Sequence, residues 1–186
     1  MGSQSILRFI PVLAALVLLP GEAWTEAGGP PEAEVKAEFL ERFTRFIDWP
    51  QGGFKNPEAP FALCLLGRTP LEPYLARMAR TRRIKDRSIQ VRTLAGPGEV
   101  EGCSLVWISP EAAGSLEQVL ERTAGKAILT VGDTEGLAAR GAHINLKREG
   151  TRLTFDINVA QAKRSGLRFS SQLLQLGNLV GGEAPP

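Results

Sequence analysis

The two cysteines are the residues whose type and spacing point most directly to chemistry, namely a disulfide bond. Cys64 lies in the middle of the apolar run 60–67, and Cys103 opens a second run, 103–109. Short, nearly unbroken apolar runs are typical of strands buried on both faces. If the runs are neighbours in one sheet, the sulfur atoms can meet. Closing a loop of about forty residues would stabilise the fold by about 4 kcal/mol, so stability would be redox-sensitive. In an oxidising compartment we expect the bond rather than two buried thiols.

The N-terminal segment predicts export to such a compartment. Arg8 precedes an apolar run, 9–19, which has the length of a signal-peptide core and is too short to span a bilayer comfortably. Small residues at Gly21 and Ala23 make 1–23 the expected signal peptide, with a later cleavage site at Ala27. An uncleaved membrane anchor is the alternative. No cysteine stands directly after the apolar run, so we expect a soluble, exported protein without a lipid anchor.

Few residues are placed for catalysis. His143 is the only histidine and has no obvious partner beside it, which argues against a histidine-based triad and a histidine-rich metal site. Its edge-strand pattern predicts an exposed side chain. The carboxylates of Asp133, Glu135 and Asp156 could face one another at strand ends as an acid–base pair. Asp133 also has the position of a helix cap. We expect no catalytic residue, no metal and no cofactor.

The stretch between Arg77 and Arg87 contains six cationic residues, but the whole chain carries a net charge of only +2. This charge is too small to predict nucleic-acid binding. In an exported protein we expect the stretch to be a solvated face, with an anionic membrane surface or an acidic protein as alternative contacts. With 186 residues, 43% of them hydrophobic and 23% charged, the chain is expected to form one globular domain.

Strand-like runs alternate with helical periodicities. This pattern predicts a single α/β domain with a mixed, mostly parallel β-sheet, flanking helices, and a C-terminal edge hairpin and helical segment. The domain is expected to span 34–180, after a linker at 24–33 and before a flexible tail at 181–186. The predicted strands are 61–66, 88–94, 105–108, 127–131, and the hairpin of 143–147 and 152–157. The predicted helices are 32–48, 71–83, 110–123, a short one at 134–139, and 159–179, broken near Gly166.

Six motifs in this order resemble the YfiR-like family of periplasmic proteins, and they cover about 35–176, nearly all of the expected mature chain. They are Val35–Leu40 with Phe43, Phe46 and Trp49–Pro50; Leu63–Gly67; Cys103 with Ile108–Ser109; Leu129–Asp133; Gly141 and Ile144 with Phe155–Asn158; and Gly166–Leu176. Cys64 and Cys103 match the family's structural cysteine pair. A second pair that some members carry is missing, since Ala138 and Asn145 stand there. Arg140 stands where the family often has the first glycine of a Gly-Gly pair.

The resemblance implies a regulatory protein rather than an enzyme. It implies a repressor that binds the periplasmic sensor domain of an inner-membrane diguanylate cyclase and so lowers cyclic-di-GMP output. An outer-membrane lipoprotein that sequesters the repressor, a homodimer, and a link to redox stress through disulfides are implied as well. Because the second cysteine pair is absent, a switch resting on that pair is not expected here.

A repressor needs a surface for its partner, and the C-terminal segment is the candidate. Aromatic and arginine side chains are favoured at the centres of interfaces. The expected partner-binding residues are Leu167, Arg168, Phe169, Gln172 and Leu174, whereas Leu173 and Leu176 are expected in the core. The alternative is that these leucines only seal the sheet. A different function, a periplasmic small-molecule binding module, would place Trp49 or Trp107 in a pocket between sheet and helices.

Overall fold

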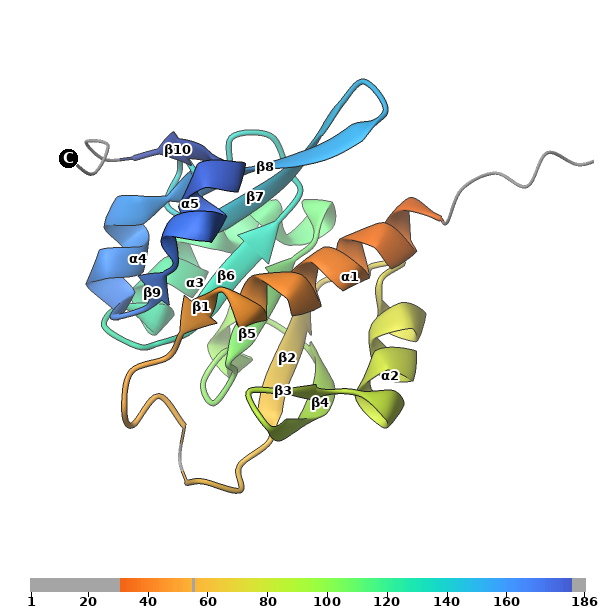
Figure 1. Cartoon of the computed structure of the whole chain (residues 1–186), viewed down its shortest axis with the longest axis vertical. Coiled ribbons are helices and arrows are strands. Elements are labelled where there is room, and N and C mark those ends of the chain that lie inside the picture. Colours follow the sequence, from red (N-terminus) through yellow and green to blue (C-terminus); the bar gives the residue numbers. More distant parts are fainter. Residues whose placement is uncertain (1–30, 55, 182–186) are drawn as a thin grey trace, which may run out of the picture.

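A β-sheet with helices on both faces positions nearly every residue discussed above (Figure 1). The structure is a computed structural model that describes residues 31–54 and 56–181. The expected signal peptide, most of the expected linker and residues 182–186 of the expected tail lie outside the described residues. Within the described residues, every helix is too short or too polar to cross a bilayer.

The strands are β1 (Ile47–Asp48), β2 (Phe61–Leu66), β3 (Arg83–Ile84), β4 (Arg87–Leu94), β5 (Leu105–Ile108), β6 (Leu129–Gly132), β7 (Ile144–Glu149), β8 (Arg152–Asn158), β9 (Arg168–Phe169) and β10 (Asn178–Val180). The α-helices are α1 (Glu32–Arg45), α2 (Glu72–Thr81), α3 (Leu116–Thr123), α4 (Val159–Ser165) and α5 (Ser171–Leu176). Two short 3-10 helices, η1 (Pro97–Glu99) and η2 (Pro110–Ser115), precede β5 and α3.

In the described part of the chain, eight strands form one sheet in the order β10-β8-β7-β6-β5-β2-β4-β3. Strands β4, β2, β5, β6 and β7 run parallel, and β10 is parallel to β8. The antiparallel pairs in this sheet are the hairpins β3–β4 and β7–β8. The mixed, mostly parallel α/β sheet expected from the sequence is therefore confirmed.

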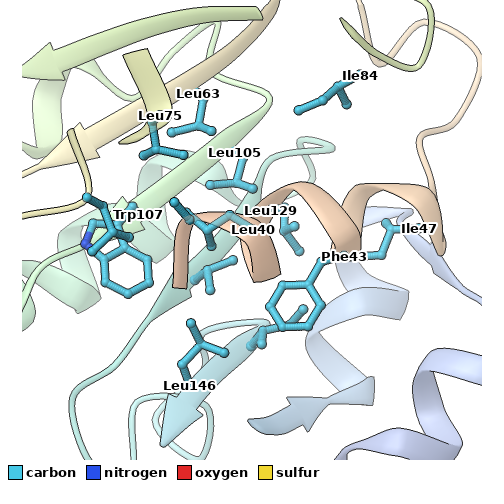
Figure 2. Close-up of a cluster of buried hydrophobic side chains, with 14 of the residues drawn as sticks. Leu40, Phe43, Ile47, Leu63, Leu75, Ile84, Leu105, Trp107, Leu129 and Leu146 are labelled. Atoms are coloured by element: carbon cyan, nitrogen blue, oxygen red, sulfur yellow. The ribbon is translucent and has the colours of Figure 1, made fainter. Parts of the chain in front are cut away.

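Helices bury both faces of the central strands, which explains why β2 and β5 are apolar from end to end. On one face, α1 and α2 pack on the sheet; Figure 2 shows Leu40 and Phe43 of α1 among strand side chains such as Leu105 and Leu129. On the opposite face, α3 packs its buried residues against the other side of the same strands. This second cluster includes Leu116, Val119, Ala62, Cys64 and Val106.

The C-terminal segment differs from the broken helix expected over 159–179. Helix α4 ends at Gly166, whose left-handed backbone (φ 74°) caps it by donating its N–H to Ala162 and Lys163 carbonyls. β9 then pairs with β1, which shortens the first helix so that α1 ends at Arg45 and not at Asp48. After α5, β10 pairs with β8, so the β7–β8 hairpin has one further short strand outside it.

Residues 134–139 form turns and not the expected short helix. The loop lies where the chain returns from β6 to β7. Its Leu137 is fully buried beside Gly132, where an added Cβ would lie 2.4 Å from a Leu137 methyl carbon. Packing of this one leucine into the core, together with Gly136 in a left-handed conformation (φ 70°), favours a turn over a regular helix.

The basic stretch is largely occupied by contacts within the chain. Arg82 makes a two-pronged contact with Glu38 of α1 (2.8 and 2.9 Å), and Arg77 pairs with Glu34. Lys85 lies 3.3 Å from Asp48. Exposed pairs of this kind contribute about 0–1 kcal/mol each, so the two pairs with α1 orient α2 against it more than they stabilise the fold.

Candidate functional site: an apolar groove between α1, β8 and α5

The two cysteines form a disulfide bond, as predicted. β2 and β5 are parallel neighbours with Leu63 opposite Leu105, and this register brings the Cα atoms of Cys64 and Cys103 to 6.0 Å. Cys64 is fully buried and Cys103 is 5% exposed. The bond therefore lies on the α3 face of the sheet. It links β2 to the residues just before β5. These two strands are neighbours, and the strands that follow β2 in the sequence, β3 and β4, lie on the other side of β2.

His143 is not the exposed strand residue that the sequence pattern predicts. It is 1% exposed, because the whole run Ala142–Leu146 is buried and the expected alternation does not hold. Burial, with a smaller effect of the Arg164 charge, lowers the pKa of His143 from 6.5 to about 3, so the ring is neutral.

The hydrogen bonds of His143 fix the direction of its protons. The N–H of Thr130 donates to Nδ1 (3.1 Å), so Nδ1 carries no proton and Nε2–H donates to the Ser165 hydroxyl (2.8 Å). Ser165 in turn donates to the Ala162 carbonyl (3.0 Å). A nucleophilic serine would instead donate to the ring. The arrangement is that of a fully bonded structural histidine.

The three carboxylates considered for acid–base chemistry are not brought together as a pair. Asp133 lies 2.6 Å from Lys36 of α1, and Asp156 lies 2.8 Å from Lys147. Strand β7 separates the two, since Gly132 is opposite Asn145 and Asn145 is opposite Asp156. Glu135 is exposed on the turn.

The lysine partners of these carboxylates stay protonated. Burial by itself lowers the pKa of Lys36, but its hydrogen bonds to Asp133 and Glu32 outweigh burial and raise the pKa above its usual range. Hydrogen bonds to Asp156 and Glu149 likewise raise the pKa of Lys147. Both contacts are thus ion pairs: Lys36–Asp133 ties α1 to the end of β6, and Lys147–Asp156 joins β7 to β8.

Trp49 and Trp107, the tryptophans within the described residues, do not line a pocket between sheet and helices. Trp107 is fully buried among the core side chains (Figure 2). Trp49 is half-buried and packs edge-on against Phe61, with ring centroids 5.2 Å apart. Both rings are packing residues, whereas the alternative of a small-molecule binding module needs one of them to be open to a ligand.

The residues expected to bind a partner are unevenly exposed. Leu167 is 3% exposed and belongs to the core, so its side chain does not reach the surface. Arg168 and Gln172 are exposed, and Phe169 and Leu174 are half-buried. Leu173 is in the core as expected, but Leu176 is not: it is 71% exposed.

Leu176 borders a groove of ≈ 430 Å³ that the sequence did not predict, which we call the aromatic groove. Its walls come from α1, β8 and α5, and it is lined by Phe39, Arg42, Phe43, Phe46, Leu153, Thr154, Phe155, Leu173 and Leu176. Three of the rings form an edge-to-face cluster, with centroid distances of 5.8 Å for Phe39–Phe43 and 4.9 Å for Phe43–Phe155.

The sequence contained a signal for this groove. The buried stripe of α1 is Ala37, Leu40 and Phe43, yet Phe39 and Phe46 are also apolar. Both are only half-buried, because they lie beside the stripe and not on it. An apolar arc wider than the buried face of a helix indicates a second contact surface.

The family model DUF4154, described as YfiR/HmsC-like, matches residues 33–178. No curated protein matches. A conserved domain protein from Vibrio cholerae O1 biovar El Tor is similar in structure, with 11% identity and a TM-score of 0.53. The ABC domain from Streptococcus pneumonia, solved in complex with L-Trp, has 9% identity and a TM-score of 0.51.

Each of these structural comparisons covers 80% of this chain, which spans 60% and 61% of the respective relatives. At such low identity they show a shared fold alone. The family match over residues 33–178 includes both cysteines, the residues that line the aromatic groove, and α5. The chain belongs to the YfiR/HmsC-like family, a family of periplasmic proteins that regulate signalling.

Proposed function

We propose that this protein is a periplasmic repressor that binds the periplasmic sensor domain of an inner-membrane signalling protein through the aromatic groove and α5. The observation that supports the proposal most is the exposure of Leu176, 71%, at the edge of a groove lined by aromatic rings. Large apolar side chains gathered at one exposed place are typical of interaction sites.

The composition of the surface fits a protein partner. Four phenylalanines and Arg42 line the groove, and aromatic and arginine residues are enriched at the energetic centres of interfaces. Arg168 and Gln172, two of the residues expected from the sequence, are exposed on the neighbouring β9 and α5. They supply the polar rim that such a site needs.

We propose further that the bound sensor belongs to a diguanylate cyclase and that binding lowers cyclic-di-GMP synthesis. An outer-membrane lipoprotein that covers the same groove would release the cyclase. A homodimer formed through the groove would compete with both. Deletion of the gene should therefore raise cellular cyclic-di-GMP, and an unchanged level in cells that contain the cyclase would count against this part of the proposal.

Substitution of Leu176 by glutamate tests the binding surface. We expect Leu176→Glu to weaken binding of the sensor domain by about 2 kcal/mol, or roughly thirtyfold, because a charge would replace an apolar contact. Stability should change by no more than about 0.5 kcal/mol, since the side chain is already mostly in solvent. Affinity is measured by titration with the purified sensor domain.

The matched control is Gln175→Glu, which adds the same charge at the preceding exposed position of α5. It should bind within about twofold of the unaltered protein, since it is not part of the groove. Equal binding by both variants would rule out the aromatic groove as the contact. Loss of self-association in Leu176→Glu, with sensor binding intact, would assign the groove to a homodimer instead.

A further inference from the structure

A second hollow lies at the amino ends of β5 and β6, and its lining residues are all different from those of the aromatic groove. It has a volume of ≈ 590 Å³, within the range of about 300–1,000 Å³ typical of small-molecule sites. Four segments surround it: 50–53 after β1, 102–103 before β5, 125–128 before β6, and 163–166 at the end of α4. We call it the basic hollow.

Three cations converge on the basic hollow from two elements: Lys126 from the loop before β6, and Lys163 and Arg164 from α4. No carboxylate is among its lining residues. Lys126 pairs with Glu101 just outside the lining, at 2.5 Å. Lys163 and Arg164 have no carboxylate partner among the residues that the structure describes.

Arg164 is held in place by a neutral partner. Its Nε and Nη2 both donate to the Gln161 side-chain carbonyl, at 3.1 and 2.8 Å, so the guanidinium is oriented without losing its charge. Lys163 and Arg164 are adjacent like charges that repel each other, and a bound anion would remove that repulsion.

Five of the residues that line the hollow are glycines. Gly52, Gly102 and Gly125 all have left-handed backbones (φ +86°, +77° and +68°), which favour glycine. A Cβ at any of the three would meet no other atom within 4 Å, so the space beside them is open. Turns of this kind leave peptide groups accessible, and peptide N–H groups bind anions.

The basic residues of α4 have another possible role, since cations near a helix C-terminus interact favourably with the helix dipole. That role does not account for Lys126, which approaches from a different loop, nor for the hollow between them. From the charge and the volume, we propose that the basic hollow binds a small phosphate-bearing anion. The site is separate from the aromatic groove, so this proposal does not depend on the partner.

Titration of the full chain with inorganic pyrophosphate tests the site, with amide chemical shifts and calorimetry as readouts. We expect saturable binding that shifts the amides of Gly52, Gly102 and Gly125 and weakens as NaCl is raised. The double variant Lys163→Gln/Arg164→Gln should bind roughly tenfold more weakly or worse, because charge-assisted hydrogen bonds are lost.

The matched control, Arg140→Gln/Arg152→Gln, removes two exposed positive charges elsewhere. It should bind within about twofold of the unaltered chain, because these charges are outside the hollow. Absence of saturation, or equal weakening in both double variants, would overturn the site. Citrate serves as a carboxylate probe. Saturation by citrate but not by pyrophosphate would overturn the phosphate assignment, whereas the reverse result would support it.

Discussion

Reduction of the Cys64–Cys103 disulfide is expected to lower the free energy of unfolding by about 4 kcal/mol. The bond closes a loop with a sequence separation of 39, which contains α2, β3 and β4. Without it the unfolded chain gains the freedom of that loop, while the folded chain keeps the same strand pairing. Since a domain of ordinary stability has about 5–15 kcal/mol in total, the reduced protein should be marginally stable.

Urea unfolding measures this effect when it is carried out on three samples: the oxidised protein, the same protein in a phosphine reductant, and the double variant Cys64→Ala/Cys103→Ala. The reductant should move the midpoint of the unaltered protein to a much lower urea concentration and leave the double variant unchanged. If the reductant does not move the midpoint of the unaltered protein, the bond contributes nothing to stability and the proposed redox sensitivity fails.

Acidification is expected to destabilise the protein through one histidine. The folded-state pKa of His143, about 3, lies below the unfolded value of 6.5. Between these two pH values the unfolded chain binds a proton that the folded chain does not. The free energy of unfolding therefore falls as pH falls through this window, by about 1.4 kcal/mol per unit well below pH 6.5, and by about 2 kcal/mol between pH 7 and pH 5.

Thermal and urea unfolding at pH 7, 6 and 5 measure this slope, and His143→Gln is the control. His143 is the only histidine, and free carboxylates titrate mainly below about pH 4.5, so few other groups contribute over this range. The variant should be less stable at pH 7, because bonds to Thr130 and Ser165 are disturbed, but its profile should be nearly flat. A slope in the variant equal to that of the unaltered protein would show that His143 is not its source.

The central strands could be predicted from the sequence because they are decided locally. β2 and β5 are apolar at every position, so their burial on both faces could be predicted. Their pairing was only a condition for the expected disulfide, and the register of the two strands supplies it. Membership of the YfiR-like family was expected from six sequence motifs, and the family match over residues 33–178 confirms it.

The C-terminal segment could not be predicted because distant partners decide its structure. β9 forms by pairing with β1, and β10 by pairing with β8, in preference to a longer helix. Gly177, the residue after Leu176, lies so close to Phe155 that a Cβ there would be 2.7 Å from the ring, and the local sequence does not reveal such a long-range contact. The prediction that His143 is exposed was wrong, because its burial depends on hydrogen bonds to Thr130 and Ser165, which only the fold brings beside it.

Helix α5 is only six residues long, yet it is fastened on both sides. Ser170 caps its start by accepting the N–H of Leu173, β9 ties the preceding residues to β1, and β10 ties the following ones to β8. A helix this short does not persist by itself in water. Because these anchors already hold it rigid, a binding protein would meet a preorganised platform, and little conformational entropy would be lost in forming the complex.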